Sequence, residues 1–431
     1  MGLSRRELLR GAAGIAGLGM FGAGFSATPA EGRVVIVGGG FGGATCARYL
    51  RAIAPAVSVT LIERRTRLAT GPFCNTVVAG LNPIEAITVD HRALAAAGVN
   101  VVQADVRDLD PVARRVRLPD GDTLAADHLV VAPGIDFDWF PIEGYGPKVT
   151  DALPHAWTAD RDQIVNLRNQ LRAMPEDGVV AIAIPPNPYR CPPGPYERAS
   201  LIGHFLEQHK PRAKLLLLDA KDHFSKEALF RAGWAEHYGE RIEWIGRPQG
   251  GAVVAVDAGN RTLVTAGGER VRADVINVIP PQIAGALARD VDLTDISDWA
   301  PVDHRSFEST RHRRVHVLGD ACQGGPMPKS GYAANVQGKI CAHAIAASLA
   351  GDTFAGTRLI NACYSLVTPD HGISVSQVYD LNGRHFAAIE DAGGTSPLAA
   401  SVDDRARVAG YARSWYRNIV RDTFGDPTNI G

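Results

Sequence analysis

One segment near the start of the chain constrains the fold most. An apolar, β-branched run at residues 33–37 leads directly into Gly38, Gly40 and Gly43, which fit the pattern G-x-G-x-x-G and open a predicted helix. Glycines permit a tight turn and the close approach of a pyrophosphate, and the amides at a helix N-terminus supply positive potential. Glu63 ends the next apolar run, about 20 residues later, where a carboxylate binds a ribose. The segment predicts a βαβ unit that binds a dinucleotide.

Two further apolar runs indicate which dinucleotide binds. Residues 127–134 end at Gly134, and residues 315–321 end in Gly319-Asp320-Ala321. Both are similar to the paired signatures of flavoproteins with two dinucleotide folds, in which the aspartate bonds the FAD ribityl chain. The resemblance implies FAD as the cofactor, with Gly134 and Asp320 at its site. A helix-capping role is the alternative for Asp320.

A helix is expected from Ala333 to Leu349, just after the segment P-M-P-K-S-G-Y at residues 326–332. The dipole of this helix and the ammonium of Lys329 would stabilise negative charge on the reduced flavin ring. A solvated lysine is the alternative.

The middle of the chain carries a second strand of this type, at residues 179–184, but no glycine triad follows it. Six prolines lie between Pro185 and Pro195. Proline has no amide hydrogen and fixes φ, so this loop is unsuited to cradling a pyrophosphate. A helix at residues 196–209 and a strand at residues 214–218 nevertheless continue the α/β pattern. We expect a second Rossmann-like domain without an NAD(P)H site.

These patterns predict an α/β chain with two Rossmann-like dinucleotide-binding domains, as in glutathione reductase, and a C-terminal α+β interface domain. Lysine and arginine number 45 against 46 acidic residues, so no charge excess favours nucleic acid. The expected divisions are an export signal at 1–30, an FAD domain at 31–145 and 283–352, a second domain at 146–282 and an interface domain at 353–431.

The first thirty residues resemble a twin-arginine export signal. Arg5-Arg6 precede a Gly/Ala-rich apolar stretch from Gly11 to Phe25 and small residues at 27–30. We expect a periplasmic protein; a buried or membrane-anchoring helix is the alternative. No later segment has the roughly 18 apolar residues of a transmembrane helix.

The six cysteines form no C-x-x-C motif, and the chain has no His-rich tract, so no metal site is expected. The haem-attachment motif C-x-x-C-H is also missing, so any haem is expected to belong to a partner. Cys191 follows a parallel strand at its carboxyl end, where ligands of such sheets approach. Cys46, Cys322 and Cys341 are expected to be buried and inert.

The segments R-C-P-P-G-P-Y-E-R-A at 190–199, P-M-P-K-S-G-Y at 326–332 and C-Y-S at 363–365 resemble the flavoprotein subunit of flavocytochrome c sulfide dehydrogenase. The resemblance extends from about Arg33 to about Gly425. It implies that Cys191 and Cys363 form a redox-active disulfide beside FAD, that sulfide is the substrate, and that a c-type cytochrome subunit accepts the electrons. A structural bridge or two buried thiols is the alternative.

Glu197 lies near Cys191 at a helix start and is the candidate for handling protons at the sulfurs. A first-turn glutamate favoured by the helix dipole is the alternative. Family members attach FAD through a cysteine that aligns with Gly71. Cys74 and Asn75 follow in the same loop, so we expect noncovalent FAD, with a thioether through Cys74 as the alternative.

The last helix is expected at residues 403–424, with Val408, Tyr411, Trp415 and Ile419 on one apolar face. This face would pack on the core, dock a cytochrome or touch a membrane surface. Two rival functions remain: a sulfide:quinone oxidoreductase of the same fold, and a noncatalytic FAD-binding accessory protein.

Overall fold

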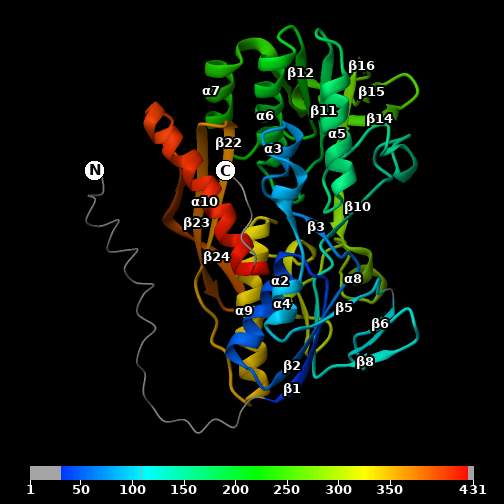
Figure 1. Cartoon of the computed structure of the whole chain (residues 1–431), viewed down its shortest axis with the longest axis vertical. Helices are drawn as coiled ribbons and strands as arrows, with labels where there is room; N and C mark the ends of the chain where they lie inside the picture. The colour runs from blue at the N-terminus through cyan, green and yellow to red at the C-terminus, as the bar shows by residue number, and fades with distance from the viewer. Residues whose placement is uncertain (1–30, 107, 426–431) are drawn as a thin grey trace.

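The computed structural model describes residues 31–106 and 108–425. The export signal expected at residues 1–30 lies outside the described residues. The molecule is elongated, with the first βαβ unit at one end and the central domain at the other (Figure 1). The observed α/β architecture, with a C-terminal sheet and helix, confirms the predicted fold class, whereas the exact domain boundaries stay a prediction.

A seven-stranded sheet forms the first domain, in the order β19-β20-β21-β9-β1-β2-β5. Five neighbouring strands of this sheet are parallel: β21, β9, β1, β2 and β5. At one edge, β19 and β20 pair in antiparallel fashion. The apolar run in β1 is buried from Val34 to Val37, as expected of a strand covered on both faces. The strand bounds are β1 (Gly32–Val37), β2 (Val57–Glu63), β5 (Asn100–Gln103), β9 (His128–Val131), β19 (Val302–Asp303), β20 (Glu308–Ser309) and β21 (Val315–Val317).

Two helices pack closely over this sheet, α2 (Phe41–Ile53) and α9 (Gly331–Leu349). A Cβ atom on Gly338 would lie 2.5 Å from the Gly42 carbonyl oxygen, so glycine at this position permits the close approach. The remaining elements of this domain are β3 (Leu68–Ala69), α3 (Cys74–Val78), η2 (Ile84–Ile87), β4 (Thr88–Val89), α4 (Arg92–Ala96), β6 (Asp108–Asp110), β7 (Arg115–Arg117), β8 (Thr123–Ala125), α8 (Ala286–Asp290) and η6 (Gly319–Ala321).

The central domain has a parallel four-stranded sheet in the order β13-β12-β11-β17. The short ladder between β10 and β18 joins it to the first domain. Its elements are β10 (Ile135–Phe137), η3 (Pro147–Val149), α5 (Arg161–Ala173), β11 (Val179–Ile184), α6 (Gly194–His209), β12 (Lys214–Asp219), α7 (Glu227–His237), η4 (Gly239–Arg241), β13 (Ile242–Ile245), η5 (Arg247–Gln249), β14 (Val253–Asp257), β15 (Thr262–Thr265), β16 (Arg270–Arg272), β17 (Val275–Val278) and β18 (Gln282–Ala284).

The C-terminal domain is an antiparallel sheet of β22 (Leu359–Thr368), β23 (His371–Asn382) and β24 (His385–Thr395), with α10 (Val402–Phe424) packed across it (Figure 1). No described helix is long and apolar enough to span a membrane.

The buried face of α10 differs from the one expected. Ile419 is buried as predicted, but Tyr411 is 55% exposed, and the buried row runs through Ala409, Ala412 and Tyr416. A Cβ atom on Gly372 of β23 would lie 2.3 Å from the Ala409 amide nitrogen. At Gly372 the helix therefore lies so close to the sheet that the small Ala409 side chain is buried there and the larger Val408 is only half-buried.

Candidate functional site

A cavity of about 620 Å³ lies at the carboxyl ends of the parallel strands of the first domain. Five predicted cofactor residues line it: Gly38, Gly40, Glu63, Gly134 and Asp320. Ligands of open α/β sheets bind at this edge. The cavity continues past residues 70–72 to Gly331 at the start of α9.

The glycine loop has the geometry that a pyrophosphate site requires. Gly38 has φ +103°, and a Cβ atom there would lie 2.2 Å from the Ala132 carbonyl oxygen. A Cβ atom on Gly43 would lie 2.0 Å from the Gly38 carbonyl oxygen. At Gly40, by contrast, a Cβ atom would meet nothing within 4 Å, although the residue lines the cavity. Two glycines thus permit the turn, and the third leaves space for a ligand.

Glu63 lies at the end of β2, where a ribose-binding acid is expected. Its two carboxylate oxygens accept hydrogen bonds from the amides of Gly39 (2.8 Å) and Arg65 (3.0 Å). Each carboxylate oxygen has a further lone pair, so these bonds orient the side chain and still leave it able to accept from a ligand.

Asp320 lines this cavity, and one of its two carboxylate oxygens lacks a hydrogen bond within the described residues. Its Oδ1 is buried and has no hydrogen-bond partner within residues 31–106 and 108–425, and its Oδ2 lies 3.9 Å from Nη1 of Arg190. Burial raises the pKa of the Asp320 carboxyl, and the charges of Arg190 and Lys329 oppose this rise. An unpaired buried carboxylate oxygen is costly, whereas a bound hydroxyl would satisfy it. Together with the open space at Gly40, this oxygen fits the ribityl hydroxyls and pyrophosphate of FAD.

Lys329 lies beside a second cavity that adjoins the first. Its ammonium donates hydrogen bonds to the carbonyls of Asp320 and Cys322, both at 2.8 Å, and lies 3.6 Å from the ring centroid of Trp299. These groups line a second, adjacent cavity of about 570 Å³, and Lys329 does not line the main one. Its contact with the flavin ring stays a prediction.

Cys191 is held in an unusual backbone conformation, and its neighbours Arg190 and Pro192 line the first and the second cavity. Its φ of 60° is in the left-handed region, which a residue with a side chain rarely adopts. The Cys191 amide donates to the Lys329 carbonyl at 2.8 Å, and its carbonyl accepts from the Gly194 amide at 2.8 Å. A Cβ atom on Gly194 would lie 2.9 Å from the Cys191 sulfur. The loop thus fixes the thiol, and Gly194 leaves room for it.

Cys363 reaches the same region from β22, whose register pairs it with Val375 of β23. The two thiols are not bonded to each other in the structure. They are electrostatic neighbours, since burial and then the negative charge of Cys363 raise the pKa of Cys191 well above its ordinary value. The structure therefore places the two cysteines that the sequence singled out within electrostatic range of each other, whereas their pairing as a disulfide stays a prediction.

Glu197 lies beside both sulfurs, in the first turn of α6. One carboxylate oxygen accepts from the Leu366 amide of β22 at 2.9 Å, and the other accepts from Asn75 at 2.8 Å. Burial raises the pKa of Glu197, and these two hydrogen bonds oppose the rise. Its charge in turn raises the pKa of Cys191 and Cys363.

Asn75 and Cys74 do not line the main cavity. Asn75 joins α3 to α6, because it donates to Glu197 and accepts from Nε of Arg198 at 3.0 Å. The Cys74 sulfur is buried and lies 3.8 Å from Nη2 of Arg198. The cavity wall is formed instead by Gly71 and Pro72.

Lys226 is a site residue that the sequence analysis missed. It is only 9% exposed and donates to the Ser365 hydroxyl at 2.8 Å, two residues after Cys363 on the same strand face. Its positive charge lowers the pKa of Cys191, Cys363 and Glu197. A single lysine between two elements gives no sequence signal.

The central domain has an acid at the position where a nicotinamide site would bind a ribose. Asp219, at the end of β12, is fully buried. Its carboxylate accepts from Lys221 (2.6 Å), Tyr196 (2.6 Å) and Trp244 (2.9 Å). The acid that would bind a ribose there is therefore already satisfied.

Comparisons with known proteins decide the family. The model described as "Sulfide dehydrogenase [flavocytochrome c] flavoprotein chain, central" matches residues 164–280, and "Flavocytochrome c sulphide dehydrogenase, flavin-binding" matches residues 356–424. "Pyridine nucleotide-disulphide oxidoreductase" matches residues 32–172. The chain is 60% identical over 45 residues to the sulfide dehydrogenase [flavocytochrome c] flavoprotein chain of Chlorobaculum thiosulfatiphilum, covering 94% of that sequence and 10% of this one.

The chain belongs to the flavocytochrome c sulfide dehydrogenase flavoprotein family. It is also similar to the mitochondrial sulfide:quinone oxidoreductase of Mus musculus, with 21% identity over 321 residues that cover 71% of this chain and 69% of that protein. The sulfide:quinone oxidoreductase structure from Aquifex aeolicus has the same fold, with a TM-score of 0.71, 17% identity and coverage of 91% of this chain and 92% of that one. Membership makes this chain an oxidoreductase with an FAD-binding fold.

Replacing Asp320 by alanine tests the cofactor site of this family member. The alanine variant loses the hydrogen bond that the Asp320 carboxylate would accept from FAD, so FAD binding should weaken roughly 10- to 100-fold. The fluorescence of the flavin released on dilution measures this loss. Asp136 is the matched control, because it also lines the cavity but is paired with Arg289 at 3.3 Å. Equal flavin loss from Asp136→Ala and Asp320→Ala would contradict the assignment.

Proposed function

We propose that this chain is the FAD-bearing subunit of a sulfide dehydrogenase, which oxidises sulfide through a Cys191–Cys363 disulfide and passes the electrons to a c-type cytochrome subunit. One observation carries the proposal: two thiols that are far apart in sequence lie within electrostatic range of each other and of a buried carboxylate and a buried ammonium. Arg190, the neighbour of Cys191, lines the cavity suited to FAD. Family membership and the similarity to sulfide:quinone oxidoreductases support sulfide as the substrate.

The first step is a thiol–disulfide exchange. Hydrosulfide attacks one sulfur of the Cys191–Cys363 bond; a new S–S bond forms, the old one breaks, and the products are a cysteine persulfide and the thiolate of the other cysteine. The two electrons lost by sulfide now reside on the reduced pair. A second hydrosulfide then attacks the outer sulfur of the persulfide and leaves with it as hydrodisulfide, so that both cysteines remain as thiolates. FAD, when bound, would accept the two electrons that these thiolates give up as the disulfide re-forms.

Lys226 and Glu197 control charge during this step. Each thiol has a pKa raised by burial, so the thiolate leaving group needs a compensating cation. Lys226 provides this cation, since it opposes the rise at both sulfurs. Glu197 is the buried carboxylate that accepts the proton of the sulfide or persulfide, and its two hydrogen bonds hold it in place.

The electrons are proposed to leave by a route other than nicotinamide. The carboxylate of Asp219, which would bind the ribose of NAD(P)H, is already hydrogen-bonded to side chains of the protein. The C-terminal domain offers a surface for a protein acceptor. Tyr332 and Tyr364, which directly follow the cavity residue Gly331 and the reactive Cys363, line a groove with Trp415 and the exposed Tyr411. Exposed aromatic side chains are enriched where proteins dock, so this groove is our candidate for the cytochrome interface.

The cofactor is proposed to bind without a covalent link and to be released on denaturation, since Cys74 lies behind the cavity wall beside Arg198. Export to the periplasm by the twin-arginine route rests on Arg5-Arg6 and the apolar stretch that follows. N-terminal sequencing of the mature chain, beginning near residue 31, would test the export.

Serine at Cys191 or at Cys363 should reduce sulfide-dependent bleaching of the flavin roughly 1000-fold or more, because neither variant can form the disulfide. Anaerobic stopped-flow absorbance measures this, and the visible spectrum shows that FAD stays bound. Cys341→Ala is the control, since that thiol is also buried but lies in α9. Flavin reduction that survives both serine variants would refute the disulfide mechanism and favour the accessory-protein alternative.

Glu197→Gln should slow flavin reduction roughly 100-fold. In the unchanged protein the rate should fall as the pH drops through the raised pKa of Glu197, because a protonated carboxyl no longer accepts a proton. The glutamine variant should lose this acidic limb. Glu207→Gln, on the exposed face of the same helix, should keep it. A profile that is unchanged in Glu197→Gln would assign proton handling to another group.

The acceptor is tested by supplying cytochrome c, a water-soluble quinone or NAD⁺ to the sulfide-reduced protein. We expect reoxidation by the cytochrome, and Tyr411→Glu should slow it about 10-fold without changing bleaching by sulfide. Phe140→Glu, at a side chain that is 97% exposed, is the control. Faster turnover with quinone would favour the sulfide:quinone oxidoreductase alternative, which the similarity to those enzymes supports.

A further inference from the structure

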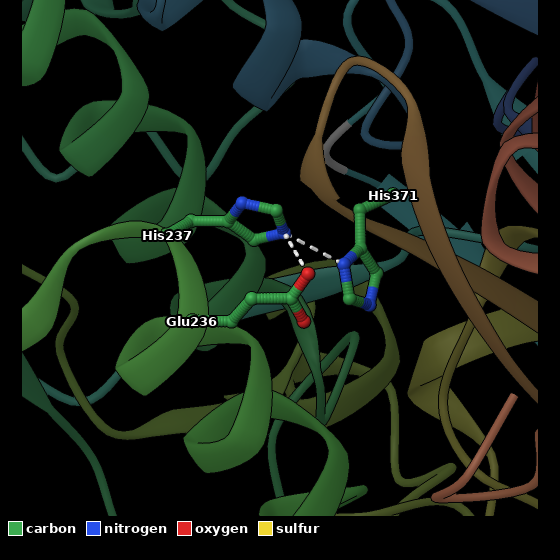
Figure 2. A group of neighbouring side chains, drawn as sticks. All are labelled: Glu236, His237 and His371. Atoms are coloured by element: carbon green, nitrogen blue, oxygen red, sulfur yellow. Dashed lines mark hydrogen bonds and ion pairs between the residues drawn. The ribbon is translucent and has the colours of Figure 1, made fainter. Parts of the chain in front are cut away.

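Three potential metal ligands meet away from the sulfur site, where the C-terminal end of α7 contacts the first residue of β23. Glu236 and His237 belong to the last turn of α7, and His371 starts β23. The Nε2 atom of His237 lies 2.8 Å from Nδ1 of His371 and 3.6 Å from Oε1 of Glu236. Figure 2 shows both α7 side chains turned toward the His371 ring. The three ligand atoms lie within 4.8 Å of one another.

The His371 side chain has the properties of a ligand. Only 6% of His371 is exposed, and its Nε2 has no hydrogen-bond partner among the described residues. The hydrogen bond to His237 is therefore the one polar contact that the ring makes in this part of the chain.

The distances between the three ligand atoms are close to those found around a tetrahedrally coordinated zinc ion. Ligand atoms about 2.1 Å from a zinc ion lie about 3.3 Å apart. The two imidazole nitrogens would have to separate by about half an ångström, and the Glu236 oxygen would have to move inward. Glu236 is free to rotate because its side chain is 56% exposed. Two histidines and one glutamate leave the fourth position to water.

We propose that Glu236, His237 and His371 bind one divalent transition-metal ion of the zinc class, which fastens α7 to the β22–β23 hairpin. The opposite end of α7 is already tied to this hairpin by the bond from Lys226 to Ser365. A metal at the far end would hold the helix that presents Lys226 against the strand that presents Cys363. The site requires neither sulfide nor an electron acceptor and is independent of the proposed function.

The test titrates Zn²⁺ into the chelator-treated, FAD-loaded full chain, with the cysteines kept oxidised so that thiols do not compete. Calorimetry should give one zinc per chain, and the melting temperature should rise with zinc concentration. Glu236→Gln, a change at an exposed side chain, should weaken binding at least about 10-fold. His237→Ala should abolish the stoichiometric binding. Co²⁺ in place of Zn²⁺ should give the visible bands of a tetrahedral site.

His223→Ala is the matched control, because His223 also lies near a glutamate of α7, at 3.5 Å from Glu227, but has no second imidazole. It should bind zinc as the unchanged protein does. The proposal is overturned if no stoichiometric zinc binds, or if Glu236→Gln and His237→Ala both bind zinc with unchanged affinity. Sulfide-dependent flavin reduction is measured separately, so failure of the metal site leaves the proposed function untouched.

Discussion

The hydrogen bond from the Cys191 amide to the Lys329 carbonyl joins the central domain to the FAD domain at the point where chemistry is expected. It holds Cys191 at a left-handed φ that its side chain disfavours, and the proline-rich loop on either side supplies the rigidity. The same prolines remove the amides that a nicotinamide site needs. One loop thus positions the thiol and also underlies our prediction that the central domain has no nicotinamide site.

The buried charges around that thiol depend on one another. Arg198 is fully buried and donates to Asn75 and to the carbonyls of His155 and Ala156, and Asn75 in turn orients Glu197. Isolated buried charges are costly, whereas a hydrogen-bonded set is tolerated and fixes geometry. This set keeps a carboxylate beside two sulfurs, with Lys226 as the balancing cation.

The sequence was sufficient to predict those site residues that belong to a short, recognisable motif. Gly38, Gly40 and Glu63 belong to the strand–turn–helix pattern and Asp320 to the later Gly-Asp signature, and the structure places these four around one cavity. Gly43, the third glycine of the triad, packs against the turn instead. Lys226 had no such signature, because its importance arises only when β22 packs against α7. The buried face of α10 was wrong by one position, since Gly372 admits the helix backbone more closely than hydrophobic periodicity reveals. Periodicity reports which residues are apolar, not how closely two elements approach.

The central claim is that Cys191 and Cys363 form an oxidised pair beside the flavin. Nonreducing digestion of the purified, oxidised protein, with free thiols alkylated first, tests it by mass spectrometry. The account predicts a single cross-linked peptide pair containing both cysteines, which disappears when sulfide is added anaerobically. Recovery of both residues as alkylated free thiols from protein whose flavin is still reduced by sulfide would contradict it.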